Sequence, residues 1–216
     1  MKISIKKMCV TAMLAAIAFV VANTLHISIF PTAPFLKYEP KDVVITIGGF
    51  LYGPLASLLI SVVVSLPEVM VSGTGPIGCV MDVLSTCSFA CVAALIYKKR
   101  HSLTGAIGGL CLGTVLMVAA MLLWNWVVSP LYMGVARPAV EGMLLPVFLP
   151  FNLLKAGLNS ALVLFLYKPI VTALRKARLV ESQSRNNGSS KIGLYLFAAA
   201  LLINCIVLIL VIKGIL

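Results

Sequence analysis

The sequence has few charged residues: aspartate, glutamate, lysine and arginine together make up 11% of its 216 residues. Hydrophobic residues make up 61%. A soluble domain of this length does not need so much apolar surface, so the composition predicts an all-α, polytopic membrane protein. The formal net charge of +11 does not indicate nucleic-acid binding, because the basic residues cluster near the ends of the apolar segments.

The sequence also lacks the motifs that mark enzymes. It contains no HExxH, no Gly-x-Ser-x-Gly, no P-loop and no close pair of carboxylates within an apolar segment. We therefore expect no catalytic residues, no ATP hydrolysis by this chain, and no metal or cofactor. The six cysteines form no CxxC pair and are expected to be small apolar side chains in the membrane. An intramembrane enzyme stays a distant alternative.

Seven apolar segments are expected to be helices. They cover about 8–25, 43–52, 55–71, 79–97, 104–128, 147–167 and 192–212. Asp42 is expected to cap the second helix, Gly53-Pro54 to end it, and Pro130 to end the fifth. These segments divide the chain into a membrane domain over 1–175, a polar linker over 176–191 and an additional transmembrane helix over 192–216.

The distribution of basic residues predicts the orientation in the membrane. Lysines 2, 6 and 7, the cluster 98–100 and the stretch 168–191 fall on one side when the helices are counted in order, and basic loops are cytoplasmic. No convincing cleavage site follows the first apolar segment, so it is expected to be retained. We therefore expect a multi-pass protein of a bacterial-type plasma membrane, with a cytoplasmic N-terminus. The loops 26–41, 72–78 and 132–146 then lie outside.

Three polar residues lie within the sixth apolar segment. Asn152, Lys155 and Asn159 are spaced at i, i+3 and i+7, which places them on one helical face. A lysine in the hydrocarbon region costs about 3 kcal/mol or more, so it is rarely there without a partner. An ammonium and two amides can satisfy the carbonyl oxygens and ring nitrogens of a planar heteroaromatic ligand, and Asn125 lies at a similar depth on the fifth helix. The alternative is that Lys155 snorkels to the outer headgroups.

Other polar and aromatic residues near the expected outer surface have two interpretations. Glu68 and Asp82 are either solvated rim charges or ion-pair partners of a basic loop residue. Those basic residues are Lys37, Lys41 and Arg137. Trp124 and Trp126 are typical of an outer aromatic belt, and stacking on a ligand is the alternative.

The stretch FPTAPFLKYEPKDVVITIGGFLYGPLASLL resembles the first loop and second helix of the riboflavin-specific S components of energy-coupling factor (ECF) transporters. The GTGPIG loop, the phrase from Asn125-Trp126 to Pro130-Leu131-Tyr132, and PFNLLK resemble further motifs of that family, in the same order. The resemblance covers about residues 8–175. It implies a six-helix substrate-binding subunit without ATPase activity, which works with a transmembrane coupling protein and two cytoplasmic ATPases.

The resemblance also implies a ligand and a site. The family's flavin-contacting asparagine on the fifth helix matches Asn125, and its Asn-x-x-Lys pair on the sixth matches Asn152 and Lys155. We therefore expect riboflavin, or a flavin-like vitamin, to be captured from outside for ATP-driven uptake. The expected ligand-binding set is completed by Asn159 and by residues of the first loop that can cover an aromatic ligand: Phe35, Leu36 and Tyr38.

Small residues form a stripe on the first helix. Thr11, Ala15, Ala18 and Ala22 recur at spacings of four, three and four. Such stripes let helices approach closely in lipid. The resemblance implies that this stripe contacts the coupling protein, and the alternative is packing against another helix of the same chain.

The chain departs from the family's pattern at three places near the expected site. Where the first loop usually reads Asp-x-Ser-Asp, this chain has Glu39-Pro40-Lys41-Asp42. Ser65-Leu66-Pro67-Glu68 stands where a Lys-Asn pair often ends the third helix, and Asp82 replaces an asparagine. These departures leave another vitamin or a nucleobase-like compound as the alternative ligand. The seventh helix is extra, and we expect it not to touch the pocket.

Overall fold

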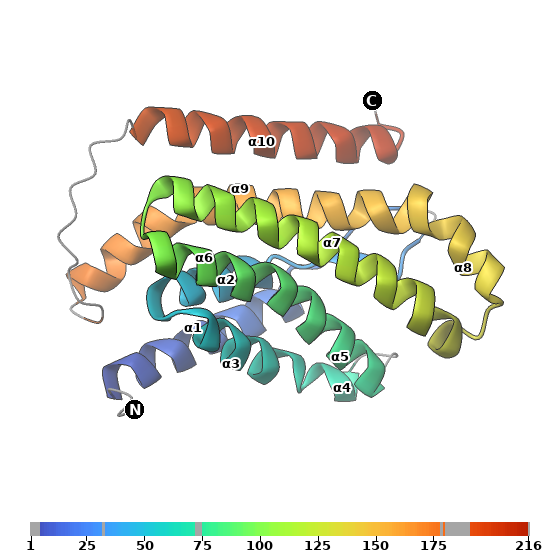
Figure 1. Ribbon diagram of the computed structural model, residues 1–216, viewed down its shortest axis with the longest axis horizontal. Coiled ribbons are helices and arrows are strands. Elements are labelled where there is room, and N and C mark those ends of the chain that lie inside the picture. Colours follow the sequence, from blue (N-terminus) through green and yellow to red (C-terminus); the bar gives the residue numbers. More distant parts are fainter. Residues whose placement is uncertain (1–4, 32, 72–74, 178, 180–190, 216) are drawn as a thin grey trace.

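The computed structural model describes residues 5–31, 33–71, 75–177, 179 and 191–215. Its long helices run side by side as a bundle (Figure 1). Five of the described helical segments are long and apolar enough to cross a membrane: 5–24, 75–100, 103–133, 137–176 and 193–212. The prediction of an all-α polytopic fold is confirmed.

The described elements follow one another along the chain in this order. They are α1 (Ile5–Thr24), β1 (Ile27–Ser28), β2 (Lys37–Tyr38), α2 (Lys41–Tyr52), α3 (Pro54–Ser65), α4 (Glu68–Val71), α5 (Gly75–Thr86), the π-helical turn η1 (Cys87–Cys91), α6 (Val92–Arg100), α7 (Leu103–Met133), α8 (Arg137–Met143), the π-helical turn η2 (Leu144–Phe148), α9 (Leu149–Lys176) and α10 (Lys191–Ile212). The two short strands pair antiparallel within the first loop, with Ile27 opposite Tyr38.

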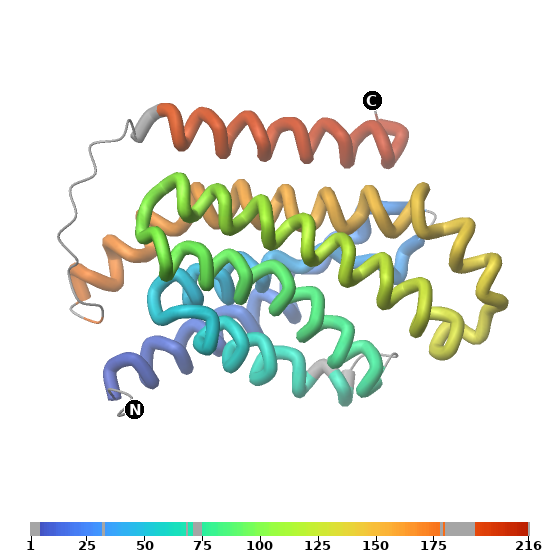
Figure 2. The backbone as a smooth tube through the Cα atoms, in the orientation of Figure 1, coloured from blue at the N-terminus to red at the C-terminus, as the bar shows by residue number. Residues whose placement is uncertain are grey.

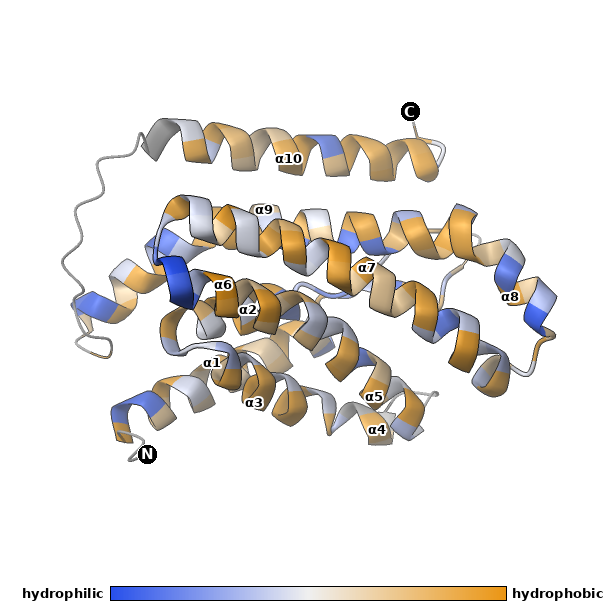
Figure 3. Ribbon diagram, viewed as in Figure 1, coloured by the Kyte–Doolittle hydropathy of each residue, from blue (hydrophilic) through white to orange (hydrophobic). Residues whose placement is uncertain are grey.

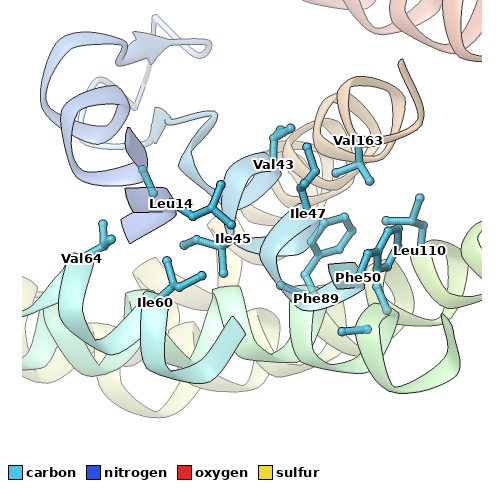
Figure 4. Packing of buried hydrophobic residues seen from close by; sticks show 14 of the residues in the cluster. Leu14, Val43, Ile45, Ile47, Phe50, Ile60, Val64, Phe89, Leu110 and Val163 are labelled. Carbon is cyan, nitrogen blue, oxygen red and sulfur yellow. The ribbon is translucent and has the colours of Figure 1, made fainter. Parts of the chain in front are cut away.

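Helix α2 is short and central. Nine of its 12 residues are buried, and it packs against α1, α3, α6 and α9. Figure 4 shows side chains of α2, among them Ile45 and Phe50, packed in a core with Leu14 of α1 and Ile60 of α3. As predicted, the helix ends at Gly53, whose φ of 94° favours glycine. The polar residues that begin α2 therefore lie deep in the bundle.

Two predicted helix boundaries near prolines differ from the structure. A continuous segment over 55–71 is wrong, because α3 ends at Ser65 and α4 begins after Pro67, which has no N–H to continue the helix. The expectation that Pro130 ends the fifth helix is also wrong. Helix α7 continues through Pro130 to Met133 and ends at Gly134, which has a φ of 64°.

Two expected outer loops are largely helical. The segment 132–146 contains α8, which has Pro138 in its first turn. The N–H groups of a first turn have no acceptor within the helix, so a proline there removes no hydrogen bond. Residues 75–78 form the start of α5 rather than a loop. Residues 72–74, and most of the predicted linker over 176–191 (178 and 180–190), lie outside the described residues.

The ends of the helices divide into two groups. The start of α1, the end of α6, the end of α9 and the start of α10 lie at one end of the bundle, whereas α8 and the start of α5 lie at the other (Figures 1 and 2). Basic residues 98–100, 175 and 176 therefore share one end, as the predicted orientation requires. Between the ends the helices are predominantly apolar, and α10 is apolar along most of its length (Figure 3).

The small-residue stripe of α1 packs inside the chain. Ala18 is fully buried, Ala15 and Ala22 are nearly so, and Thr11 is half-buried. The three alanines belong to the core that α1 shares with α2 and α3. This is the placement that internal packing requires, and contact with a coupling protein stays a prediction.

Candidate ligand-binding site

A buried carboxylate joins α9 to the start of α2. The Asp42 side chain is fully buried, and its Oδ1 accepts a hydrogen bond from Thr86 Oγ1 at 2.7 Å. Its Oδ2 accepts from Asn159 Nδ2 at 3.1 Å and lies 3.3 Å from Lys155 Nζ. Lys155 is only 8% exposed, so it pairs inside the bundle and does not reach the surface as snorkelling requires. The expectation that Asp42 caps α2 is wrong, because its carboxylate faces these partners.

The first loop reaches the same cluster through Tyr38. The Tyr38 hydroxyl donates to Asn159 Oδ1 at 3.0 Å. Burial, and then the nearby Asp42 carboxylate, raise the pKa of the Tyr38 phenol, so it stays protonated and able to donate. The amide of Asn159 therefore holds the loop on one side and α2 on the other. Asn159 therefore stabilises the packing of the loop and α2 against α9.

A second ion-pair group lies beside the first. Lys41 is 1% exposed, and its Nζ lies 2.9 Å from Glu39 Oε2 and 3.0 Å from Asp82 Oδ2. Ser65 also donates to Asp82 Oδ2. The ion-pair interpretation of Asp82 is confirmed, whereas the side chain of Glu68 lies outside the described residues. Buried charges need such pairing, because an isolated charge in a low-dielectric interior is strongly destabilising.

Asn125 and Asn152 are both buried and both bond to their own helices. Asn125 Nδ2 donates to the Met121 carbonyl at 2.7 Å, and its Oδ1 accepts from Ser129 at 2.7 Å. Asn152 Nδ2 donates to the Phe148 carbonyl at 2.8 Å. An asparagine amide has two donors and an acceptor with two lone pairs, so these bonds do not exhaust either side chain.

The first loop lies on the beginning of α9 and on the turn η2 that precedes it. Phe30 packs edge-on against Phe151, with ring centroids 6.4 Å apart, and Phe35 packs against Phe148 at the same distance. Phe35 nevertheless remains 46% exposed, and Leu36 is half-buried. The loop residues predicted to cover a ligand thus adjoin the helix that carries Asn152 and Lys155.

The two tryptophans of α7 differ. The Trp126 indole donates to Glu141 Oε1 at 2.9 Å, and the Arg137 guanidinium lies 5.4 Å from its ring centroid, so Trp126 is held against α8. The Trp124 indole N–H is buried and has no acceptor among the residues that the structure describes. Buried indole N–H groups usually have a partner, which makes Trp124 a candidate donor to a ligand.

Sequence reasoning named Lys41 only as a possible ion-pair partner, and it gave no site role to Asp42, Glu39, Ser65 or Thr86. The signal for Lys41 and Asp42 was available, because adjacent opposite charges directly before an apolar helix are unlike a simple loop end. Nothing in the pattern marks Ser65 or Thr86, since hydroxyl groups are common in membrane helices. Their roles follow from the tertiary contacts alone.

Comparison with known proteins decides the family. A family model described as the substrate-specific component of the ECF transporter matches residues 6–167. The chain belongs to this family of S components. It is therefore a multi-pass membrane protein, and the family assignment made from the sequence motifs is confirmed.

Individual relatives agree with this assignment. The S component is 28% identical to riboflavin transporter RibU of Staphylococcus aureus, over 79% of this chain and 93% of the relative. It is 29% identical to riboflavin transporter FmnP of Bacillus subtilis, over 81% and 98% of the two chains. It also matches a solved structure described as the S component of a bacterial ECF transporter, with a TM-score of 0.66 and 30% identity over 79% of this chain and 98% of that one.

Proposed function

We propose that this S component captures riboflavin from outside the cell for uptake by an ECF transporter. The observation that carries the proposal is the pair Asn152 and Lys155, buried on α9 beneath an aromatic loop, in a chain similar to proteins named riboflavin transporters. A flavin ring system offers carbonyl oxygens and ring nitrogens in one plane. Ammonium and amide donors in a buried site suit such a ligand.

The polar residues divide into ligand contacts and positioning residues. Asn159 is fully buried and its amide joins Tyr38 of the first loop to Asp42 of α2, so Asn159 positions its neighbours. An ammonium has three donors, and Lys155 directs one toward Asp42, which leaves the group able to donate to a ligand oxygen. Together with the amides of Asn125 and Asn152, Lys155 supplies the polar contacts. Phe35 and Leu36 cover the ligand from the loop.

The ligand-bound chain delivers its cargo as part of an assembly. In keeping with the family, the partners are a transmembrane coupling protein and two cytoplasmic ATPases, which supply the ATP hydrolysis. Basic loops of membrane proteins face the cytoplasm, which places the basic ends of α6 and α9 there. The N-terminus is then cytoplasmic too, because α1 begins at the same end of the bundle. Since most of the α1 stripe is buried, the coupling protein can contact it only if α1 moves relative to α2 and α3.

Titration of the detergent-purified chain with riboflavin, followed by quenching of flavin fluorescence, tests the proposal. Saturable binding is expected, and bound flavin should protect amides of the loop 26–41 from hydrogen exchange while the basic end of α9 is unchanged. Native mass spectrometry of the purified chain identifies any retained compound. A different retained vitamin or a nucleobase-like compound, with no binding of riboflavin, would contradict the ligand assignment and leave the family unchanged.

A further inference from the structure

Helix α10 lies beyond the part of the chain that the family model matches, which ends at residue 167. It runs alongside α9 (Figure 1) and packs against it. Its side chains are largely exposed, and among its described residues only Ala198 and Cys205 are buried. The simplest role for an exposed apolar helix is contact with lipid alone. Cys205 indicates a further role, because it belongs to an apolar cluster that includes residues of the first loop.

This cluster, called here the loop–α10 cluster, draws on three parts of the chain. The loop and β2 contribute Ile29, Phe30, Ala33 and Tyr38; α9 contributes Phe151, Leu154 and Leu158; and α10 contributes Cys205, with Leu202, Ile209 and Ile212 packed against the group. Through this cluster α10 adjoins Tyr38, which bonds Asn159 of the polar cluster, whereas the expectation that the seventh helix does not touch the pocket stays a prediction.

Helices α9 and α10 approach each other closely where Gly157 faces Cys205. A Cβ atom added to Gly157 of α9 would lie 3.1 Å from Cys205 Sγ, which is tighter than an ordinary van der Waals contact. Gly157 is two residues from both Lys155 and Asn159, so it faces away from them on the helix. One side of α9 thus carries the polar cluster, and the other holds α10.

The burial of the loop depends on this arrangement. Ile29 is fully buried and Ala33 is 1% exposed, although both lie in a segment with little regular structure. The burial of apolar side chains stabilises a loop without regular structure, so losing the residues that cover those side chains makes the loop open more often. To admit or release a ligand the loop must leave α9, and it then also separates from the cluster that includes α10.

We infer that α10 retains the ligand by holding the first loop closed: its contacts in the loop–α10 cluster raise the barrier to loop opening and slow release. The inference rests on the proposed function for the identity of the ligand. It gives the additional helix a role in the same binding site without any polar contact to the cargo. Loop mobility, which can be measured without ligand, follows from the same contacts.

The test uses the full chain with two disruptive variants. Cys205→Phe places bulk at the contact with Gly157, and Leu202→Ala combined with Ile209→Ala removes apolar contacts without adding bulk. Matched controls on the exposed side of α10 are Ile206→Phe, and Ile203→Ala combined with Val207→Ala; these residues are 45–60% exposed. Hydrogen exchange of residues 26–39 is measured without ligand, and riboflavin release by stopped flow.

Both disruptive variants should exchange faster in the loop and release riboflavin about 10-fold faster, the change expected for a loss of about 1.4 kcal/mol, while both controls match the unaltered protein. Loop exchange and release that are unchanged in both disruptive variants would overturn the inference. Equal acceleration in the controls would also overturn it, because the effect would then be general to α10. If riboflavin binds none of the proteins, the proposed function fails, and loop exchange alone still decides the inference.

Discussion

Helices α9 and α10 lie side by side and are both long enough to cross a membrane, yet they differ in what surrounds them. In an apolar stretch of 18 residues within 137–176, the segment that contains α9, 67% of residues are buried inside the protein, against 11% in such a stretch of α10. The central helix carries Asn152, Lys155 and Asn159, whereas the peripheral one has little polarity. Polar groups are tolerated in the helix that the protein surrounds, since partners can be supplied there.

The difference also separates two kinds of stabilising contact. Helix α9 is joined to α2 by an ion pair and hydrogen bonds that converge on Asp42. Helix α10 is joined to α9 and the loop by apolar packing around Cys205. Removing one member of a buried ion pair leaves an uncompensated charge, whereas removing an apolar group leaves a small cavity. Substitutions in the two regions should therefore differ widely in effect.

The largest effect is expected where the carboxylate partner of α9 is neutralised. Asp42→Asn keeps the shape of the side chain but leaves Lys155 without its negative partner, which should destabilise the fold by about 3–5 kcal/mol. The measurement is the unfolding midpoint in detergent. The double variant Asp42→Asn with Lys155→Met removes both charges and should recover most of the stability. A single variant as stable as the original protein would show that this ion pair does not hold α9.

Lys41 and Asp82 offer a second test of buried pairing, now between α2 and α5. Lys41→Ser or Asp82→Asn alone should destabilise the fold by about 3 kcal/mol, while the double variant should lie within about 1 kcal/mol of the original protein. A double-mutant cycle on unfolding midpoints gives the coupling. Additive losses would mean that the 3.0 Å contact between the two side chains contributes no coupling energy.

An intermediate effect is expected at the packed face of α1. Ala18→Leu adds bulk at a fully buried position and should destabilise the fold by about 1–3 kcal/mol, with ligand binding and uptake reduced together. Ala12→Leu, at an exposed position of the same helix, is the control. Binding that is intact while uptake is lost would instead support a contact between the stripe and the coupling protein.

The smallest effect is expected on the outer side of α10. Leu208 is 48% exposed, so Leu208→Ala removes few protein contacts and should change stability by less than about 0.5 kcal/mol. Thermal unfolding in detergent provides the comparison with Ala18→Leu. A loss above 1 kcal/mol would show that α10 is more firmly integrated than its exposure indicates.

Much of the fold could be predicted from hydropathy and basic residues, because a membrane constrains span length and loop charge. The location of Lys155 in a buried site followed from the same constraint, since a lysine within an apolar helix needs a partner. The identity of that partner did not follow. Asp42 is 113 residues away in sequence (155 minus 42), and only the packing of α2 against α9 brings the two together.

The departures from the family's motifs show the same limit. Glu39 and Lys41 stand together at the start of α2, whereas Ser65 lies in α3 and Asp82 in α5. In the structure they form one group, in which Lys41 and Ser65 both contact Asp82. The charge of Asp82 is balanced by the Lys41 ammonium 3.0 Å away. Such compensation is a property of contacts, which a single sequence does not reveal.

The central claim is that Lys155 binds the ligand as well as pairing with Asp42, and riboflavin titration of Lys155→Ala tests it most directly. A charge-assisted hydrogen bond contributes about 1.5–3 kcal/mol, so affinity should fall about 10- to 100-fold. Lys168→Ala, which removes an exposed lysine from the same helix, is the matched control and should bind as the original protein does. The charge-balanced variant Asp42→Asn with Lys155→Met should also bind weakly although it is stable. Unchanged affinity in folded Lys155→Ala would contradict the account.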